Sequence, residues 1–111
     1  MELPGSRDTI WDNNITSNIV SNNGNGIQIS QTTSNNNGVF HNNIIGNLKQ
    51  ASNQGVNFWD LGYPYGGNYW SDYNGSDNFR GPNQDQPGSD GIGDTPYEID
   101  SNSYDNYPLM E

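Results

Sequence analysis

The sequence predicts an all-β fold built from short strands that stack on a repeat, and three observations support this. Asparagine is concentrated in the first half: 14 of the 20 Asn residues lie within residues 13–57, in turn-favouring pairs that would terminate a helix. Apolar residues between these turns come in short pieces, with the period-two alternation of a strand in Ile27-Gln28-Ile29. The same half repeats itself without a gap, which is typical of a solenoid.

The repeat suggested by the sequence has an offset of 29 residues, which places segment 10–29 above segment 39–58. Asn13-Asn14-Ile15 then falls above Asn42-Asn43-Ile44. We therefore expect about two coils of a right-handed parallel β-helix over residues 9–58. Equivalent residues would stack at about 4.8 Å, with apolar side chains in a narrow core and asparagines in hydrogen-bonded ladders.

The composition fits such a narrow core and excludes several classes of protein. Leu, Ile, Val and Phe make up only 19 of 111 residues and the net charge is −10, which would indicate disorder if a coil did not bury its inward positions alone. An acidic chain with three Lys and Arg residues is not expected to bind nucleic acid. No apolar run reaches the roughly 20 residues of a transmembrane helix, so no membrane insertion is expected.

The second half differs from the first in charge and in pattern. Residues 60–111 carry a net charge of −9, whereas residues 1–59 carry −1, so a boundary is expected near Trp59. We expect residues 59–111 to form an irregular capping module rich in aromatic residues, Gly and Asp. Residues 1–8 would be a leader outside the fold, with a Leu-Pro-Gly-Ser run typical of a cloning remnant.

The aromatic residues of this module support two interpretations. In the first, the open end of the coil stack is plugged by Phe58, Trp59, Tyr69 and Trp70, because an uncapped end would expose apolar surface. In the second, flat rings stack on the sugars of a polysaccharide or cell-surface glycan. The candidates for sugar binding are Trp11, Trp59, Tyr63, Tyr65, Tyr69 and Trp70.

Three strings in the second half carry a resemblance to a known family: Gly66-Gly67-Asn68-Tyr69-Trp70-Ser71-Asp72-Tyr73, Asp90-Gly91-Ile92-Gly93-Asp94-Thr95-Pro96-Tyr97 and Asp105-Asn106-Tyr107-Pro108-Leu109-Met110. With the Asn-rich coils before them, they resemble the C-terminal end of NosD-type right-handed β-helix proteins. These are known as periplasmic copper-binding proteins and are abundant among the surface proteins of methanogenic archaea. The resemblance implies an exported protein, extracellular or at the cell surface, or periplasmic in a bacterium.

Calcium is the metal that the acidic loops favour. Ca²⁺ takes six to eight oxygen ligands, which turns rich in Asp, Asn and Ser supply. The segment Asp90-Gly91-Ile92-Gly93-Asp94 resembles the end of the calcium loops of thrombospondin type 3 and dockerin-like repeats, and a second cluster has ligands at alternate positions. The candidate ligands are Asp72, Asn74, Ser76, Asp77, Asp85, Asp90 and Asp94. The alternative is a purely structural role, in which these side chains form Asx-turns without a metal.

Copper and catalysis are not expected. Copper sites draw on Cys, Met and His, and the chain has no Cys, one His and two Met. Asp12 and His41 would be stacked neighbours in the 29-residue register and could do acid–base work, but a surface ion pair is the commoner outcome. No Lys or Arg stands in register with them to stabilise an anionic intermediate.

The sequence therefore predicts a non-catalytic, structural or adhesive terminal module of an exported β-helix protein, stabilised by calcium. Two alternatives stay open. One is a carbohydrate-binding module. The other is a subunit that forms homo-oligomers or filaments, or that stacks on further β-helix coils, through the open strand edges of its first coil.

Overall fold

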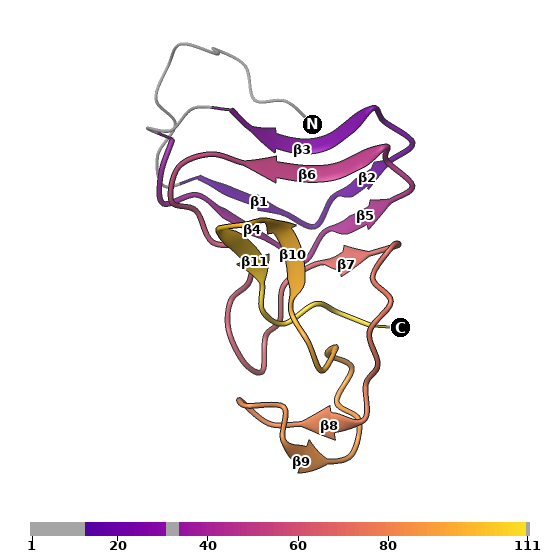
Figure 1. Cartoon of the computed structure of the whole chain (residues 1–111). Helices are drawn as coiled ribbons and strands as arrows, with labels where there is room; N and C mark the ends of the chain where they lie inside the picture. The colour runs from indigo at the N-terminus through magenta and orange to yellow at the C-terminus, as the bar shows by residue number, and fades with distance from the viewer. Residues whose placement is uncertain (1–12, 31–33, 111) are drawn as a thin grey trace.

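The computed structural model describes residues 13–30 and 34–110, and over these ranges the chain is all-β, with no helix (Figure 1). No helix long and apolar enough to cross a membrane occurs in the described part. The strands in the described ranges are β1 Asn14–Thr16, β2 Ile19–Ser21, β3 Asn25–Ile29, β4 Gly38–Phe40, β5 Asn43–Ile45, β6 Lys49–Asn53, β7 Tyr69–Trp70, β8 Phe79–Arg80, β9 Gln86–Pro87, β10 Tyr97–Asp100 and β11 Ser103–Asp105.

The Asn-rich half forms two layers of parallel strands. We call β1, β2 and β3 the first layer and β4, β5 and β6 the second layer. Each strand of the first layer pairs in parallel with the strand of the same rank in the second, and β5 also pairs in parallel with β7. Figure 1 shows the two layers one beneath the other, with the C-terminal elements below them.

The register of this pairing is 24 residues, so the predicted register of 29 is wrong. Ile15 pairs with Val39 and Val20 with Ile44. The physical reason is an internal step of five residues within each layer: Asn13, Asn18 and Asn23 stand at successive corners. An offset of 29 is one layer plus one such step, so the sequence comparison superimposed each corner on the next one.

These corners explain why the strands are so short. A residue with positive φ stands directly before five of the six corner asparagines of the two layers, and the residue before the sixth, Asn13, lies outside the described ranges. In the left-handed region the chain turns sharply, which suits Asn and Gly best. The residues concerned are Ser17, Asn22, Asn36, His41 and Gly46, with φ between 58° and 64°.

The core is a narrow stack of side chains that point inward from the layers. One column contains Ile15 and Val39, and Trp59 follows the Gly38–Phe58 bridge that extends it. A second column contains Val20, Ile44 and Trp70, which pair in register. The third column contains Ile27 and Ala51, and β10 with its buried Ile99 packs against β6 beside it.

The second half is less irregular than predicted, because it contains two antiparallel hairpins. Strands β10 and β11 pair with a register shift between Glu98 and Asp100, and β8 pairs with β9 farther from the layers (Figure 1). Leu109 bridges to Tyr69 and to Ile92, which ties the segment after β11 to β7, the strand that pairs with β5.

Candidate functional site

An asparagine ladder runs down the second corner of the stack. The backbone N–H of Asn18 donates to Asn42 Oδ1 at 3.0 Å, and that of Asn42 donates to Asn68 Oδ1 at 3.1 Å. The side-chain Nδ2 of Asn18 and of Asn42 donates to the same oxygens, at 3.2 and 3.0 Å. Each rung therefore satisfies two donors of the rung before it. The predicted ladders are confirmed, with the 24-residue spacing between the first two rungs.

Two further ladders run down the other corners, and each ends on a different residue. Asn13 donates from its backbone N–H to Asn37, and Asn37 donates to Asn57 at 2.9 Å. The third ladder runs from Asn23 to Asn47 at 2.9 Å and ends on Gln50, whose Oε1 accepts the backbone N–H of Asn47 at 3.1 Å.

The second ladder ends on a buried carboxylate, Asp105. Its Oδ2 accepts the backbone N–H of Asn68 at 2.7 Å and the indole Nε1–H of Trp70 at 2.8 Å, and its Oδ1 accepts the backbone N–H of Tyr107 at 3.1 Å. A Cβ at Gly67 would collide with this carboxylate, so glycine is required there. Asp fits this last rung better than Asn because both oxygens face donors.

Burial raises the pKa of Asp105 to about 7. Desolvation is the largest cause, and Asp60 raises the pKa slightly by charge repulsion. The hydrogen bonds from Asn68, Trp70 and Tyr107 act in the opposite direction, because they stabilise the charged form. The end of the ladder thus carries a carboxyl group that titrates near neutral pH.

Two tryptophans close the core at the same end. Trp59 and Trp70 are each 1% exposed, with ring centroids 6.2 Å apart. Tyr97 from β10 stacks on Trp70 at 4.1 Å with the ring planes only 7° apart. Burial raises the pKa of the Tyr97 phenol, and its O–H donates to Asp72 Oδ1 at 3.0 Å. Of the predicted plug, Phe58 does not take part, since it is 41% exposed.

The burial of the two tryptophans removes them from the predicted sugar-binding set. A ring with no accessible face cannot stack on an external sugar, so Trp59 and Trp70 cannot have that role. Tyr65 is 66% exposed, whereas Tyr63, which lies 6.2 Å from Tyr107 between ring centroids, and Tyr69 are half-buried. Trp11 lies outside the described residues.

The predicted calcium ligands do not gather around one point. No group of three His, Cys, Asp or Glu side chains close enough to hold a metal occurs within residues 13–30 and 34–110. Asp77 accepts the backbone N–H groups of Asp90 and Gly91, and Asp94 accepts those of Asn78 and Phe79. These are the loop-fixing contacts of the alternative interpretation.

The remaining candidate ligands are dispersed over the same loops. Asp90 accepts hydrogen bonds from Gln84 Nε2 and from the backbone N–H of Ile92. Asp72 contacts Tyr97 and Gln50 instead of the loop. Asn74, Ser76 and Asp85 are exposed.

The Asp12–His41 pair depended on the 29-residue register and does not survive the correction. His41 lies at the level of Ser17, whose N–H donates to the His41 carbonyl at 3.1 Å. The imidazole Nε2 lies 2.9 Å from the carbonyl oxygen of Tyr65. Asp12 lies outside the described residues.

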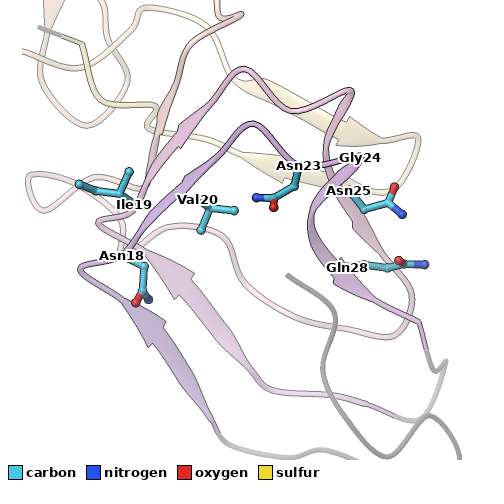
Figure 2. Close-up of a pocket in the computed structure, with 7 residues that line it drawn as sticks. All are labelled: Asn18, Ile19, Val20, Asn23, Gly24, Asn25 and Gln28. Carbon is cyan, nitrogen blue, oxygen red and sulfur yellow. The ribbon is translucent and has the colours of Figure 1, made fainter.

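The opposite end of the stack carries a hollow of about 570 Å³ on the first layer (Figure 2). Figure 2 shows that its lining comes from the corner before β2, from β2, from the turn between β2 and β3, and from β3. The lining residues are Asn18, Ile19, Val20, Asn23, Gly24, Asn25 and Gln28. The sequence pattern does not reveal this hollow, because the first and second layers have the same pattern of Asn corners and short apolar strands.

Comparisons of this chain with protein-family models, with curated proteins and with solved structures each found no match.

Proposed function

We propose that this chain is a terminal capping module of a right-handed parallel β-helix, with a structural or adhesive role at a cell surface. The observation that supports it best is the closure of one end. Asp105 ends the second asparagine ladder, and Trp59 and Trp70 end two columns of the core at the same end of the stack.

A stack of parallel strands needs such an ending. Its last layer would otherwise expose apolar side chains to water and leave the backbone N–H groups of its last rungs without acceptors. Here Asp105 supplies an acceptor for Asn68, and Tyr97 covers the outer face of Trp70. The Asp105 carboxylate is occupied by donors from Asn68, Trp70 and Tyr107, which favours a structural role for it over a catalytic one.

The experiment that tests this proposal opens the closed end. Trp70→Ala and Asp105→Ala are compared with Tyr65→Ala, which changes an exposed ring. We expect the first two variants to bind a hydrophobic dye and to self-associate in light scattering, while Tyr65→Ala behaves like the wild type. Amide hydrogen exchange separates end-opening from global unfolding, since protection should be lost near Asn68 and kept near Val20. The proposal would be overturned if Trp70→Ala and Asp105→Ala bound no more dye than the wild type and did not self-associate.

Sugar binding is a second candidate, and the exposure of Tyr65 favours it. Its ring lies near the exposed Leu61 in sequence and offers a flat face to solvent. A glycan array probed with the wild type, Tyr65→Ala and the control Tyr104→Ala tests it. Tyr104 is 43% exposed and lies on β11. A signal lost only in Tyr65→Ala would support this candidate, and no signal with the wild type would contradict it.

We also propose that Ca²⁺ stabilises the acidic loops and that the protein acts outside the cytoplasm. The net charge of −9 on residues 60–111 supports the calcium proposal, because compact acidic loops gain from a cation. The location rests on the family resemblance described for the sequence.

A further inference from the structure

The first layer of the stack has one edge that no described residue pairs with. β1, β2 and β3 each pair with one strand, on the side of the second layer, and no strand within the described ranges pairs with their other side. Such an edge presents backbone N–H and C=O groups in the geometry that an added strand requires. The closed end and this open edge therefore make the two ends of the stack different.

The ladders have a direction, and this direction specifies what fits the open edge. Asn42 Oδ1 accepts two hydrogen bonds from Asn18, one from the backbone and one from Nδ2. Asn47 Oδ1 accepts the same pair from Asn23. The Oδ1 atoms of Asn18 and Asn23 receive no hydrogen bond from any described residue. Among the described residues, Asn18 and Asn23 thus lack the donors that Asn42 and Asn47 receive from them.

The hollow on this layer has the chemical character of an interface between layers. Val20 is the apolar residue of its column, and the polar residues Asn18, Asn23 and Gln28 line the hollow around it (Figure 2). On the other side of the same layer, the equivalent positions are filled by the second layer: Ile44 lies under Val20, and Asn42 lies under Asn18. A further layer above would continue both columns.

The geometry points to one occupant: we propose that the open edge of the first layer is a docking surface for a further parallel β-coil of the same 24-residue build. This coil donates a backbone N–H and an Asn Nδ2–H to Asn18 Oδ1, and the same pair to Asn23 Oδ1. The inference deepens the proposed function, since a cap for one end of a β-helix needs coils at its other end.

A second copy of this chain does not fit the same surface. Docked through its closed end, it would present Trp70 covered by Tyr97 of β10 and a ladder already ended by Asp105, with no free rung to offer. Docked through its own first layer, it would oppose one Asn18 Oδ1 to another, and two acceptors repel. A further coil that directs its backbone N–H and Asn Nδ2–H donors toward the Oδ1 atoms of Asn18 and Asn23 avoids both problems.

The test adds one coil to the full chain by duplicating residues 13–36 directly before Asn13. We expect the added coil to raise Tm by roughly 5 °C or more and to remain monomeric. The matched control carries Asn18→Asp and Asn23→Asp in the added copy only, which removes the two amide donors, and it should lose most of that gain. In the extended protein, Asn18→Ala should lower Tm more than it does in the unmodified chain, because Asn18 then receives donors from above.

Two results would overturn the proposal. One is an added coil that folds without raising Tm, or a control that gains as much as the plain duplication. The other is a dimer of the unmodified chain at micromolar concentration that Asn18→Ala dissociates, because it would assign the surface to a second copy. The capping experiment acts on Trp70 and Asp105 at the opposite end, so either proposal can fail without the other.

Discussion

Asp105 accepts the backbone N–H of Asn68 at 2.7 Å, in the same role that Asn68 has toward the rung above it. The two residues are 37 positions apart, and one belongs to the stack while the other ends the β11 strand. A carboxylate thus replaces the amide that would continue the ladder. It offers acceptors on both oxygens and no donor, so the ladder stops there.

The first prediction concerns pH. The pKa of Asp105 is about 7 in the folded protein against an ordinary value of 3.8, so the folded state binds the proton more tightly than the unfolded state. Its contribution to the free energy of unfolding is therefore fully present below about pH 4 and is lost as the pH rises through about 7. Urea denaturation of the wild type and of Asp105→Asn at pH 5 and pH 8 measures this.

We expect the wild type to gain stability relative to Asp105→Asn when the pH falls from 8 to 5, by an amount on the order of a few kcal/mol at most. Asp85→Asn, which changes an exposed carboxylate, is the control for general charge effects. A stability difference between wild type and Asp105→Asn that is equal at both pH values would contradict the prediction.

The second prediction separates the two buried tryptophans. Trp70 Nε1–H donates to Asp105, whereas Trp59 Nε1 is buried with no hydrogen-bond partner. Trp70→Phe should therefore cost about 1–3 kcal/mol more than Trp59→Phe, because only the former leaves a buried carboxylate short of a donor. Chemical denaturation of both variants measures the difference. Equal losses of unfolding free energy in the two variants would contradict the prediction. They would show that the hydrogen bond from the Trp70 indole N–H contributes no stability beyond the packing of the ring.

The sequence predicted the parts of this architecture that depend on local composition. Asn-rich corners, short strands and a tryptophan plug follow from turn chemistry and from the need to close an apolar core. The register did not follow, because a five-residue step inside each layer makes an alignment shifted by one corner score well. Asp105 and Tyr97 could not be found from the sequence, since their partners Asn68 and Trp70 lie far away in the chain and a single Asp or Tyr carries no spacing signal.

The third prediction tests the ladder rung by rung. Asn42 is 1% exposed, and its side chain accepts from Asn18 and donates to Asn68 and to the Ile15 carbonyl. Asn42→Ala should cost about 2–4 kcal/mol, since it leaves several buried partners unsatisfied. Asn18→Ala, at the exposed first rung, should cost less than about 1 kcal/mol. Thermal denaturation of the pair checks this order, and a larger loss for Asn18→Ala would contradict it.

The last prediction addresses the acidic loops with and without calcium. Asp94 accepts the backbone N–H groups of Asn78 and Phe79, both at 2.9 Å, so Asp94→Ala should cost about 1–3 kcal/mol even in EDTA. Asp85→Ala, at an exposed side chain, should cost almost nothing under the same conditions. Melting curves of both variants and of the wild type in EDTA and in Ca²⁺ provide the measurement. If Ca²⁺ raises the Tm of the wild type and not that of Asp94→Ala, this carboxylate binds the ion as well as the backbone. Identical wild-type curves in EDTA and Ca²⁺ would refute calcium stabilisation, and the loops would then be held by their Asp–backbone hydrogen bonds alone.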